Sequence, residues 1–373
     1  MIKVCHMTSV HKSTDTRIFH KQCTSLVKAG YDVYLVAPGE SSEINGVKII
    51  GVPQIAGSRF KRMTQGAKSV YKKALEVDAD IYQIHDPELL PYSLKLKKKG
   101  KKVIFDSHED FIETLLEKNY IPKIFRRILY YSFKIYYSLI IKKYDAVITV
   151  TPHIYETLKN INTNTHMITN YPIITDSDET KIYTVSKNIV FAGGINDEWC
   201  HHTIIKALNN CDDVKYILMG PSSDIYLNKL RKMPKWESVD FLGMIPFKEV
   251  SKKLQEASIG MAIITYNRNV GFKTGTLGNT KIFEYMLEAL PIICTDFVLW
   301  KEIIDKYKNG ICVNPYNADE IADAINYLLD NPVIAEQMGQ NGRRAVLEEF
   351  NWGMEEKKLL ELYKSLQAEL RGK

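Results

Sequence analysis

The sequence lacks the patterns of a disulfide-built, secreted or membrane-spanning protein. Its six cysteines form no Cys-x-x-Cys pair, so we expect buried thiols in a reducing compartment. No run of 18 apolar residues occurs, and the opening residues MIKVCHMTSV are too short and polar for a secretory leader. We therefore expect a cytoplasmic chain without a membrane span.

Common nucleotide and metal motifs are also missing. Neither Gly-x-Gly-x-x-Gly nor Gly-x4-Gly-Lys-Ser/Thr occurs, which disfavours a hydride-transfer enzyme and an ordinary P-loop. The adjacent pair His201 and His202 would point about 100° apart on a helix and would not easily share an ion. We expect no metal and no cofactor.

Positive charge is concentrated in the first half. Residues 1–186 hold 27 Lys and Arg against 19 Asp and Glu, a net charge of +8, whereas residues 187–373 hold 23 against 25, a net charge of −2. A basic half fits nucleic acid, an anionic membrane surface or solubility alone. No recognised nucleic-acid-binding module is present, so we expect no nucleic-acid partner.

The 373 residues are too many for one ordinary domain and favour two. Short β-branched runs alternate with helical patterns throughout, which is typical of α/β folds with parallel sheets covered on both faces. We expect two doubly wound, Rossmann-like domains. The predicted boundaries are 1–172 for the first domain, 173–188 for a linker, 189–350 for the second domain and 351–373 for a terminal helix that packs back toward the first.

Polar residues follow several predicted strands, where open α/β sheets bind ligands. In the first half, His85, Asp86 and Glu88 follow one strand, and "FDSHEDF" places Asp106 and His108 after the next. In the second half, Gly193, Gly194 and Gly220 follow two strands and would let a ligand approach the backbone. We expect the two sheets to face a central cleft that holds the ligand.

Several segments together resemble glycosyltransferase family 4. They are "DTRIFHKQCTSLVKAGYDVYLVAP", "IHDPELLP", "VIFDSHED", "NYP", "FAGGI", "FLGMIP" and "NTKIFEYMLEALPII", in order over nearly the whole chain. The subgroup that the chain resembles makes bacterial capsule, exopolysaccharide or lipopolysaccharide. The resemblance implies the GT-B fold and a retaining, metal-independent enzyme that uses a UDP- or GDP-type nucleotide sugar.

The resemblance also implies site residues. Glu284 matches the second glutamate of the family's Glu-x7-Glu signature and would hold the ribose hydroxyls. The first glutamate is replaced by Thr276, so we expect Thr276, Gly278 and Asn279 to take part in sugar recognition. His108 matches a family histidine that projects toward the transferred sugar, and we predict that it positions the sugar and stabilises the transition state.

Two cations that usually hold the donor diphosphate in this family are absent, because their positions are Gly194 and Trp199. Charge on the leaving phosphate still requires stabilisation. The candidates that would replace the two cations are Lys281, which we predict to be catalytic, together with Lys273, Arg268 and Arg17.

Residues 121–144 predict a long helix with two different sides. Lys123, Arg126, Arg127, Tyr130, Lys134 and Tyr137 share one side. The opposite side carries Ile124, Phe125, Ile128, Ile135 and Leu139, which we expect to face the core. The basic, aromatic side favours binding to anionic lipid, and a merely solvated side is the alternative.

The sequence thus predicts a peripheral glycosyltransferase at the inner face of the cytoplasmic membrane. It would transfer sugar from a nucleotide-sugar donor to a lipid-linked glycan that enters near His85, Asp86 and Glu88. Two alternatives stay open, a nucleotide-sugar epimerase on the same fold and a non-catalytic, glycosyltransferase-like partner subunit. The base, sugar, linkage and oligomeric state stay unassigned.

Overall fold

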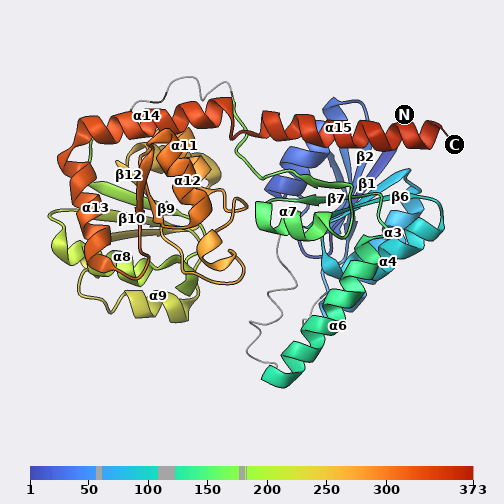
Figure 1. Ribbon diagram of the computed structural model, residues 1–373, viewed down its shortest axis with the longest axis horizontal. Helices are drawn as coiled ribbons and strands as arrows, with labels where there is room; N and C mark the ends of the chain where they lie inside the picture. Colours follow the sequence, from blue (N-terminus) through green and yellow to red (C-terminus); the bar gives the residue numbers. More distant parts are fainter. Residues whose placement is uncertain (56–60, 108–121, 176–180, 182, 373) are drawn as a thin grey trace. The chain divides into compact units, whose positions relative to one another are not determined.

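A computed structural model describes residues 1–55, 61–107, 122–175, 181 and 183–372 of the chain. The chain divides into two compact units (Figure 1). The first comprises Met1–Asn170 with Trp352–Lys373, and the second comprises Tyr171–Asn351. The predicted linker, residues 173–188, lies partly outside the described residues.

Within its described residues, the first unit forms an eight-stranded sheet in the order β3-β4-β2-β1-β5-β6-β7-β8. The strands are parallel except for β3, which runs antiparallel to β4. Their bounds are β1 Lys3–Met7, β2 Asp32–Pro38, β3 Ser42–Ile44, β4 Val47–Val52, β5 Ile81–Ile84, β6 Lys102–Ser107, β7 Ala146–Thr149 and β8 Thr165–Met167.

Helices cover both faces of this sheet because successive strand side chains point to opposite sides. Val4 of β1 packs with η1, α1 and α15 on one face, whereas Cys5 packs with α3, α4, α6 and α7 on the other. The helical bounds are η1 Thr16–Cys23, α1 Thr24–Lys28, η2 Arg62–Gly66, α3 Ala67–Val77, η3 Pro87–Leu89, α4 Leu90–Lys98, α6 Lys123–Ile141, α7 Pro152–Lys159 and α15 Trp352–Arg371.

Within its described residues, the second unit forms a six-stranded sheet in the order β11-β10-β9-β12-β13-β14, with all pairs parallel. The strands are β9 Asn188–Ala192, β10 Lys215–Met219, β11 Val239–Gly243, β12 Ile259–Ala262, β13 Ile292–Thr295 and β14 Gly310–Val313. The helices are η5 Asp197–Trp199, α8 His201–Ala207, η6 Leu208–Asn210, α9 Asp224–Leu230, η7 Trp236–Ser238, α10 Phe247–Gln255, η8 Phe272–Thr274, α11 Lys281–Leu287, α12 Val298–Tyr307, α13 Ala318–Asp330 and α14 Pro332–Glu348.

The predicted fold class is confirmed, since both units are doubly wound parallel α/β sheets. β3 and β8 are three-residue strands at opposite edges of the first sheet. Their polar residues give them no apolar run to recognise. Across the described residues, none of the helices combines the length and apolar character needed to cross a bilayer.

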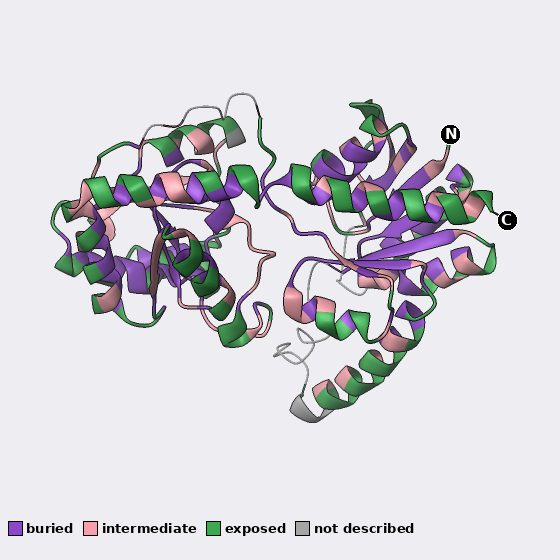
Figure 2. Cartoon of the chain, turned by 45° about the horizontal axis from the view of Figure 1, so that its top comes forward, coloured by how far each residue is buried: buried purple, intermediate pink, exposed green. Residues whose placement is uncertain are grey.

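The helix α15 completes one face of the first unit. Leu359, Leu362, Tyr363 and Leu366 are buried on one side of it, and Figure 2 shows exposed residues alternating with them. At its start, Trp352 donates a hydrogen bond from Nε1 to Ser25 Oγ at 3.0 Å. The last described helix of the chain is therefore a structural part of the first unit.

We predict that Leu362→Ala lowers the free energy of unfolding of the full chain by about 2 to 5 kcal/mol, because it removes a buried side chain and leaves a cavity. Urea unfolding followed by fluorescence measures the loss. Lys364→Ala, at an exposed position of the same helix, is the matched control and should change stability little. Equal stability of the two variants would contradict the packing of α15 described above.

Candidate active site

A cavity of about 430 Å³ opens where β1, β5 and β6 end in the first unit. The predicted acceptor-side residues His85, Asp86 and Glu88 all line it. His11, from the polar loop after β1, lines it as well. The strand order β1-β5-β6 brings together loops that are distant in sequence.

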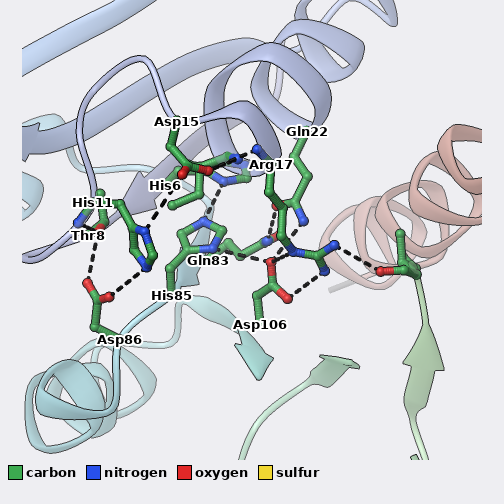
Figure 3. Close-up of polar contacts among 12 residues, drawn as sticks. His6, Thr8, His11, Asp15, Arg17, Gln22, Gln83, His85, Asp86 and Asp106 are labelled. Atoms are coloured by element: carbon green, nitrogen blue, oxygen red, sulfur yellow. Dashed lines mark hydrogen bonds and ion pairs between the residues drawn. The ribbon is translucent and has the colours of Figure 1, made fainter. Parts of the chain in front are cut away.

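The rim carboxylates are held in place by the loop after β1 (Figure 3). Asp86 accepts hydrogen bonds from Thr8 Oγ1 at 2.9 Å and from the backbone N–H of Ser9 at 2.6 Å. Its other oxygen lies 3.4 Å from His11 Nε2. Glu88 accepts from Ser9 Oγ at 3.2 Å. These contacts fix hydrogen-bonding groups at the rim.

Below the rim, Asp106 anchors a buried polar network. Arg17 donates to it from Nε at 2.9 Å and from Nη2 at 2.7 Å, and from Nη1 to the carbonyl oxygen of Ile168 at 3.0 Å. Burial alone would raise the pKa of Asp106, but the Arg17 guanidinium and His85 hold that pKa well below its ordinary value. The sequence predicted that Arg17 is one of the cations that hold the donor diphosphate. The structure instead pairs its buried charge with the carboxylate of Asp106.

Hydrogen-bond directions around Asp106 follow from one another. Gln22 donates from Nε2 to the carboxylate at 2.8 Å, so its Oε1 faces Gln83. Gln83 donates from Nε2 to that oxygen at 2.6 Å, and its own Oε1 then accepts from the Tyr363 hydroxyl at 2.7 Å. Each amide has one orientation that satisfies both neighbours.

The hydrogen-bond directions can be followed further, from Tyr363 through His6 to His85. Since the Tyr363 proton is engaged, its oxygen accepts from His6 Nε2 at 3.3 Å. Burial first, and then the neighbouring His85, hold the pKa of His6 well below its ordinary value, so its Nδ1 is an acceptor for His85 Nε2 at 3.0 Å. His85 Nδ1 lies 3.3 Å from Asp106, so the His85 ring is held between His6 and Asp106 at the cavity wall.

In the second unit, the predicted ligand-binding glycines serve the packing of the backbone. A Cβ on Gly220 would lie 1.8 Å from the carbonyl oxygen of Gly193, and a Cβ on Gly193 would overlap Lys281 Nζ at 2.0 Å. Both have positive φ, 136° and 155°. The described structure therefore requires glycine at these two positions without any ligand, whereas Gly194 is exposed and has open space around its Cα.

Lys281 lies beneath this glycine turn. Its ammonium donates to the carbonyl oxygen of Ala192 at 2.7 Å and sits 5.0 Å and 5.1 Å from the ring centroids of Phe191 and Trp199. Burial lowers the pKa of Lys281. Trp199, which occupies a position of one missing family cation, thus helps to hold another cation at the carboxyl end of β9.

Glu284 lies half-buried in the first turn of α11, and its Oε1 accepts from Thr280 Oγ1 at 2.7 Å. The loop before it is closed by its own polar groups. Thr276 Oγ1 accepts from the Gly278 N–H at 3.0 Å, and Asn279 Oδ1 accepts from the Lys281 N–H at 3.3 Å.

The remaining predicted cations stack on rings. Lys273 Nζ lies 5.3 Å from the ring centroid of Tyr266, and the Arg268 guanidinium lies 5.2 Å from that of Phe272. His108 lies outside the described residues, so its predicted role stays a prediction. Across the part of the chain that the structure describes, no group of three or more His, Cys, Asp or Glu is placed to hold a metal ion.

The predicted sides of α6 are corrected. Tyr137, expected on the lipid-facing side, is buried, whereas Phe125, Ile128, Ile135 and Leu139, expected in the core, are exposed. Of the basic side, Arg127 and Lys134 are exposed, and Arg126 and Tyr130 are half-buried. The side chains of Lys123 and Ile124 lie outside the described set.

Sequence reasoning missed His6, Gln22, Gln83 and Tyr363 as parts of the network below the cavity. His6 and Gln83 lie within strands and Tyr363 within the last helix, where no loop signal marks them. A polar residue inside an apolar strand was the available signal.

We predict that Asp106→Asn lowers the free energy of unfolding at pH 7 by about 3 to 5 kcal/mol, because it leaves the buried Arg17 charge without its partner. The folded-state pKa of Asp106 lies below its unfolded value. The wild type should therefore begin to lose this contribution as pH falls below about 4, and the two proteins should converge as pH falls through the lower, folded-state pKa of Asp106. Urea unfolding at several pH values, with the exposed Asp240→Asn as control, tests this, and a constant difference across pH would contradict it.

Comparisons with known proteins agree with this architecture. Residues 16–170 match the family model described as Glycosyltransferase Family 4, and residues 173–345 match the one described as Glycosyl transferases group 1. A search of curated proteins found no match.

Solved structures share the fold at low identity. Sucrose-phosphate synthase from Thermosynechococcus elongatus has a TM-score of 0.74 at 14% identity, over 99% of this chain and 100% of its own. Anabaena HepE in complex with UDP and glucose has a TM-score of 0.72 at 13% identity, over 98% and 100%. A glycosyltransferase from Rickettsia africae has a TM-score of 0.70 at 16% identity, over 98% of each chain. With one glycosyltransferase family model matched in each unit, the chain is a member of the GT-B glycosyltransferases.

Proposed function

We propose that this glycosyltransferase transfers a sugar with retention from a UDP- or GDP-type nucleotide sugar to a lipid-linked glycan, in bacterial capsule, exopolysaccharide or lipopolysaccharide synthesis. The observation that carries the donor assignment is the place of Glu284. Its carboxylate is half-buried in the first turn of α11 and is oriented by Thr280. The two carboxylate oxygens can accept from both ribose hydroxyls. HepE, a structural neighbour, is described in complex with UDP and glucose.

In this proposal, Lys281 stabilises the leaving diphosphate, with Lys273 and Arg268 as the remaining candidates. Support comes from the position of the Lys281 ammonium at the carboxyl end of β9, next to Gly193. A positive charge at the departing phosphate lowers the barrier without any metal ion. We therefore propose a metal-independent reaction.

The proposed reaction is a direct exchange on one face of the sugar. The bond from the anomeric carbon to the diphosphate oxygen breaks, and a bond to the acceptor oxygen forms on the same face. The acceptor hydroxyl proton passes to the diphosphate, which leaves as nucleoside diphosphate. His108 is proposed to position the transferred sugar.

The acceptor is proposed to bind in the cavity of the first unit. Asp86 and Glu88 offer carboxylate oxygens at its rim, and His11 offers a ring nitrogen. Such groups hydrogen-bond sugar hydroxyls. Association with anionic lipid through the basic residues Arg127 and Lys134 of α6 is proposed to bring a lipid-linked acceptor to this cavity.

Two experiments separate this function from the alternatives. An epimerase would convert the nucleotide sugar without an acceptor, so NMR of the donor incubated with the protein alone identifies it. A non-catalytic partner subunit would bind neither UDP nor GDP at millimolar concentration, which calorimetry measures.

We predict that Glu284→Ala weakens nucleotide binding about 10- to 100-fold, the equivalent of roughly 1.5 to 3 kcal/mol for hydrogen bonds to a charged group. Calorimetry with UDP and GDP measures the change. Glu302→Ala, at an exposed position of α12, should bind nucleotide like the wild type. Unchanged affinity in Glu284→Ala would reject the donor assignment.

We predict that Glu88→Gln raises the acceptor KM about tenfold, because a carboxylate partner of the acceptor hydroxyls is lost. Donor affinity should not change, since the donor is proposed to bind the second unit. Steady-state kinetics with the acceptor varied tests this, with the exposed Glu43→Gln of the same unit as control. A parallel loss of donor affinity would argue against an acceptor-side role.

A further inference from the structure

One side of the helix α6 exposes a stripe of apolar residues, which the exposed Ser132 interrupts near its middle. Its members are Phe125, Ile128, Leu129, Ile135, Tyr136 and Leu139, with exposed fractions between 39% for Tyr136 and 64% for Ile135. At 100° per residue they fall within about 120° of the helix circumference and extend over about 21 Å of its length. Soluble chains rarely leave such a set exposed together.

The other side of the helix is fixed to the first unit. Tyr137, Ile140 and Ile141 are buried, and the Tyr137 ring meets Phe105 edge-on at 5.8 Å. The Tyr137 hydroxyl is also hydrogen-bonded to Ser107 Oγ at 3.0 Å. The packing therefore sets the orientation that turns the apolar stripe outward, and Figure 2 shows mostly exposed residues along the coloured part of α6.

Charge along the helix indicates what kind of surface the stripe meets. The segment Lys123–Ile141 contains no Asp or Glu. Arg127, Lys134 and Lys142 are exposed. When residues are placed at 100° steps, Lys142 lies next to one border of the stripe, and Arg127 and Lys134 lie about 80° and 100° beyond that border, between the stripe and the buried side. An apolar face bordered by cations matches an anionic bilayer surface, where acyl chains lie below negative headgroups.

The same helix contacts the wall of the candidate acceptor cavity. Phe105 and Ser107, which hold Tyr137, both line that cavity. A bilayer bound to the outer side of α6 would therefore lie one helix away from the cavity wall. This geometry suits an acceptor whose lipid stays in the bilayer while its sugar enters the protein.

We propose that the stripe of α6 inserts into the interfacial layer of an anionic membrane and docks the first unit there. This inference rests on the proposed function, because a lipid-linked acceptor requires such docking. In this proposal, the apolar side chains of α6 insert into the membrane, so attachment is not purely electrostatic. The basic residues of the helix make the binding selective for anionic lipids.

The test is binding of the full chain to sedimenting vesicles of phosphatidylcholine with one fifth phosphatidylglycerol. The triple variant Ile128→Gln, Ile135→Gln and Leu139→Gln should bind at least tenfold more weakly than the wild type. The matched control is Ile225→Gln, Met244→Gln and Val298→Gln, which alters three exposed apolar residues of the second unit and should bind like the wild type. Vesicles of phosphatidylcholine alone should bind the wild type weakly.

Several outcomes would overturn the proposal. One is undiminished vesicle binding by the stripe variant, and another is equal loss in both triple variants. Light scattering supplies a third, since a wild-type dimer that the stripe variant converts to a monomer would assign the stripe to a second copy of the chain. Nucleotide binding, measured with both UDP and GDP, separates this test from the proposed function. The stripe variant should bind nucleotide like the wild type, whereas a wild type that binds neither UDP nor GDP would defeat the glycosyltransferase reaction itself.

Discussion

The buried ion pair between Arg17 and Asp106 is the constraint on which the cavity of the first unit depends. Arg17 lies in the first turn of η1, and Asp106 lies near the end of β6, so the pair joins a helix to a strand below the candidate site. The Arg17 contact with Ile168 adds the segment after β8. Buried charges are tolerated when they are paired and fully hydrogen-bonded, and both conditions hold here. The pair therefore fixes the polar floor of the cavity below Asp86 and Glu88.

In the second unit, a different arrangement holds the loops at the carboxyl ends of the strands. Glycines at positions 193 and 220 let two backbone turns approach each other, and Lys281 reaches from α11 to the carbonyl of Ala192 between aromatic rings. Enclosing a lysine between aromatic rings removes water from its ammonium, and the lowered pKa of Lys281 reflects that burial. The same few residues thus hold the lysine charge and allow the close approach of the two backbone turns.

The fold was predictable from sequence because it depends on local patterns. Continuous β-branched runs marked the central strands, and strand order explains why His85 and Asp86 reach the site. Partners were not predictable in the same way. The sequence around Arg17 does not indicate that Asp106, 89 residues later, neutralises its charge. For α6, apolar residues occur around most of the circumference, so periodicity alone selected the wrong side, and the ring contact of Tyr137 with Phe105 decides which side is buried.

The place of α15 has a consequence for biosynthesis. The apolar face formed by Val4, Ile18 and their neighbours is covered in part by Leu362 and Leu366, which the ribosome adds only after the whole second unit. Domains usually begin to fold as they emerge from the ribosome. The apolar face of the first unit therefore stays partly exposed to solvent while the second unit is being synthesised. The first unit can therefore bury this face completely only after α15 has been synthesised.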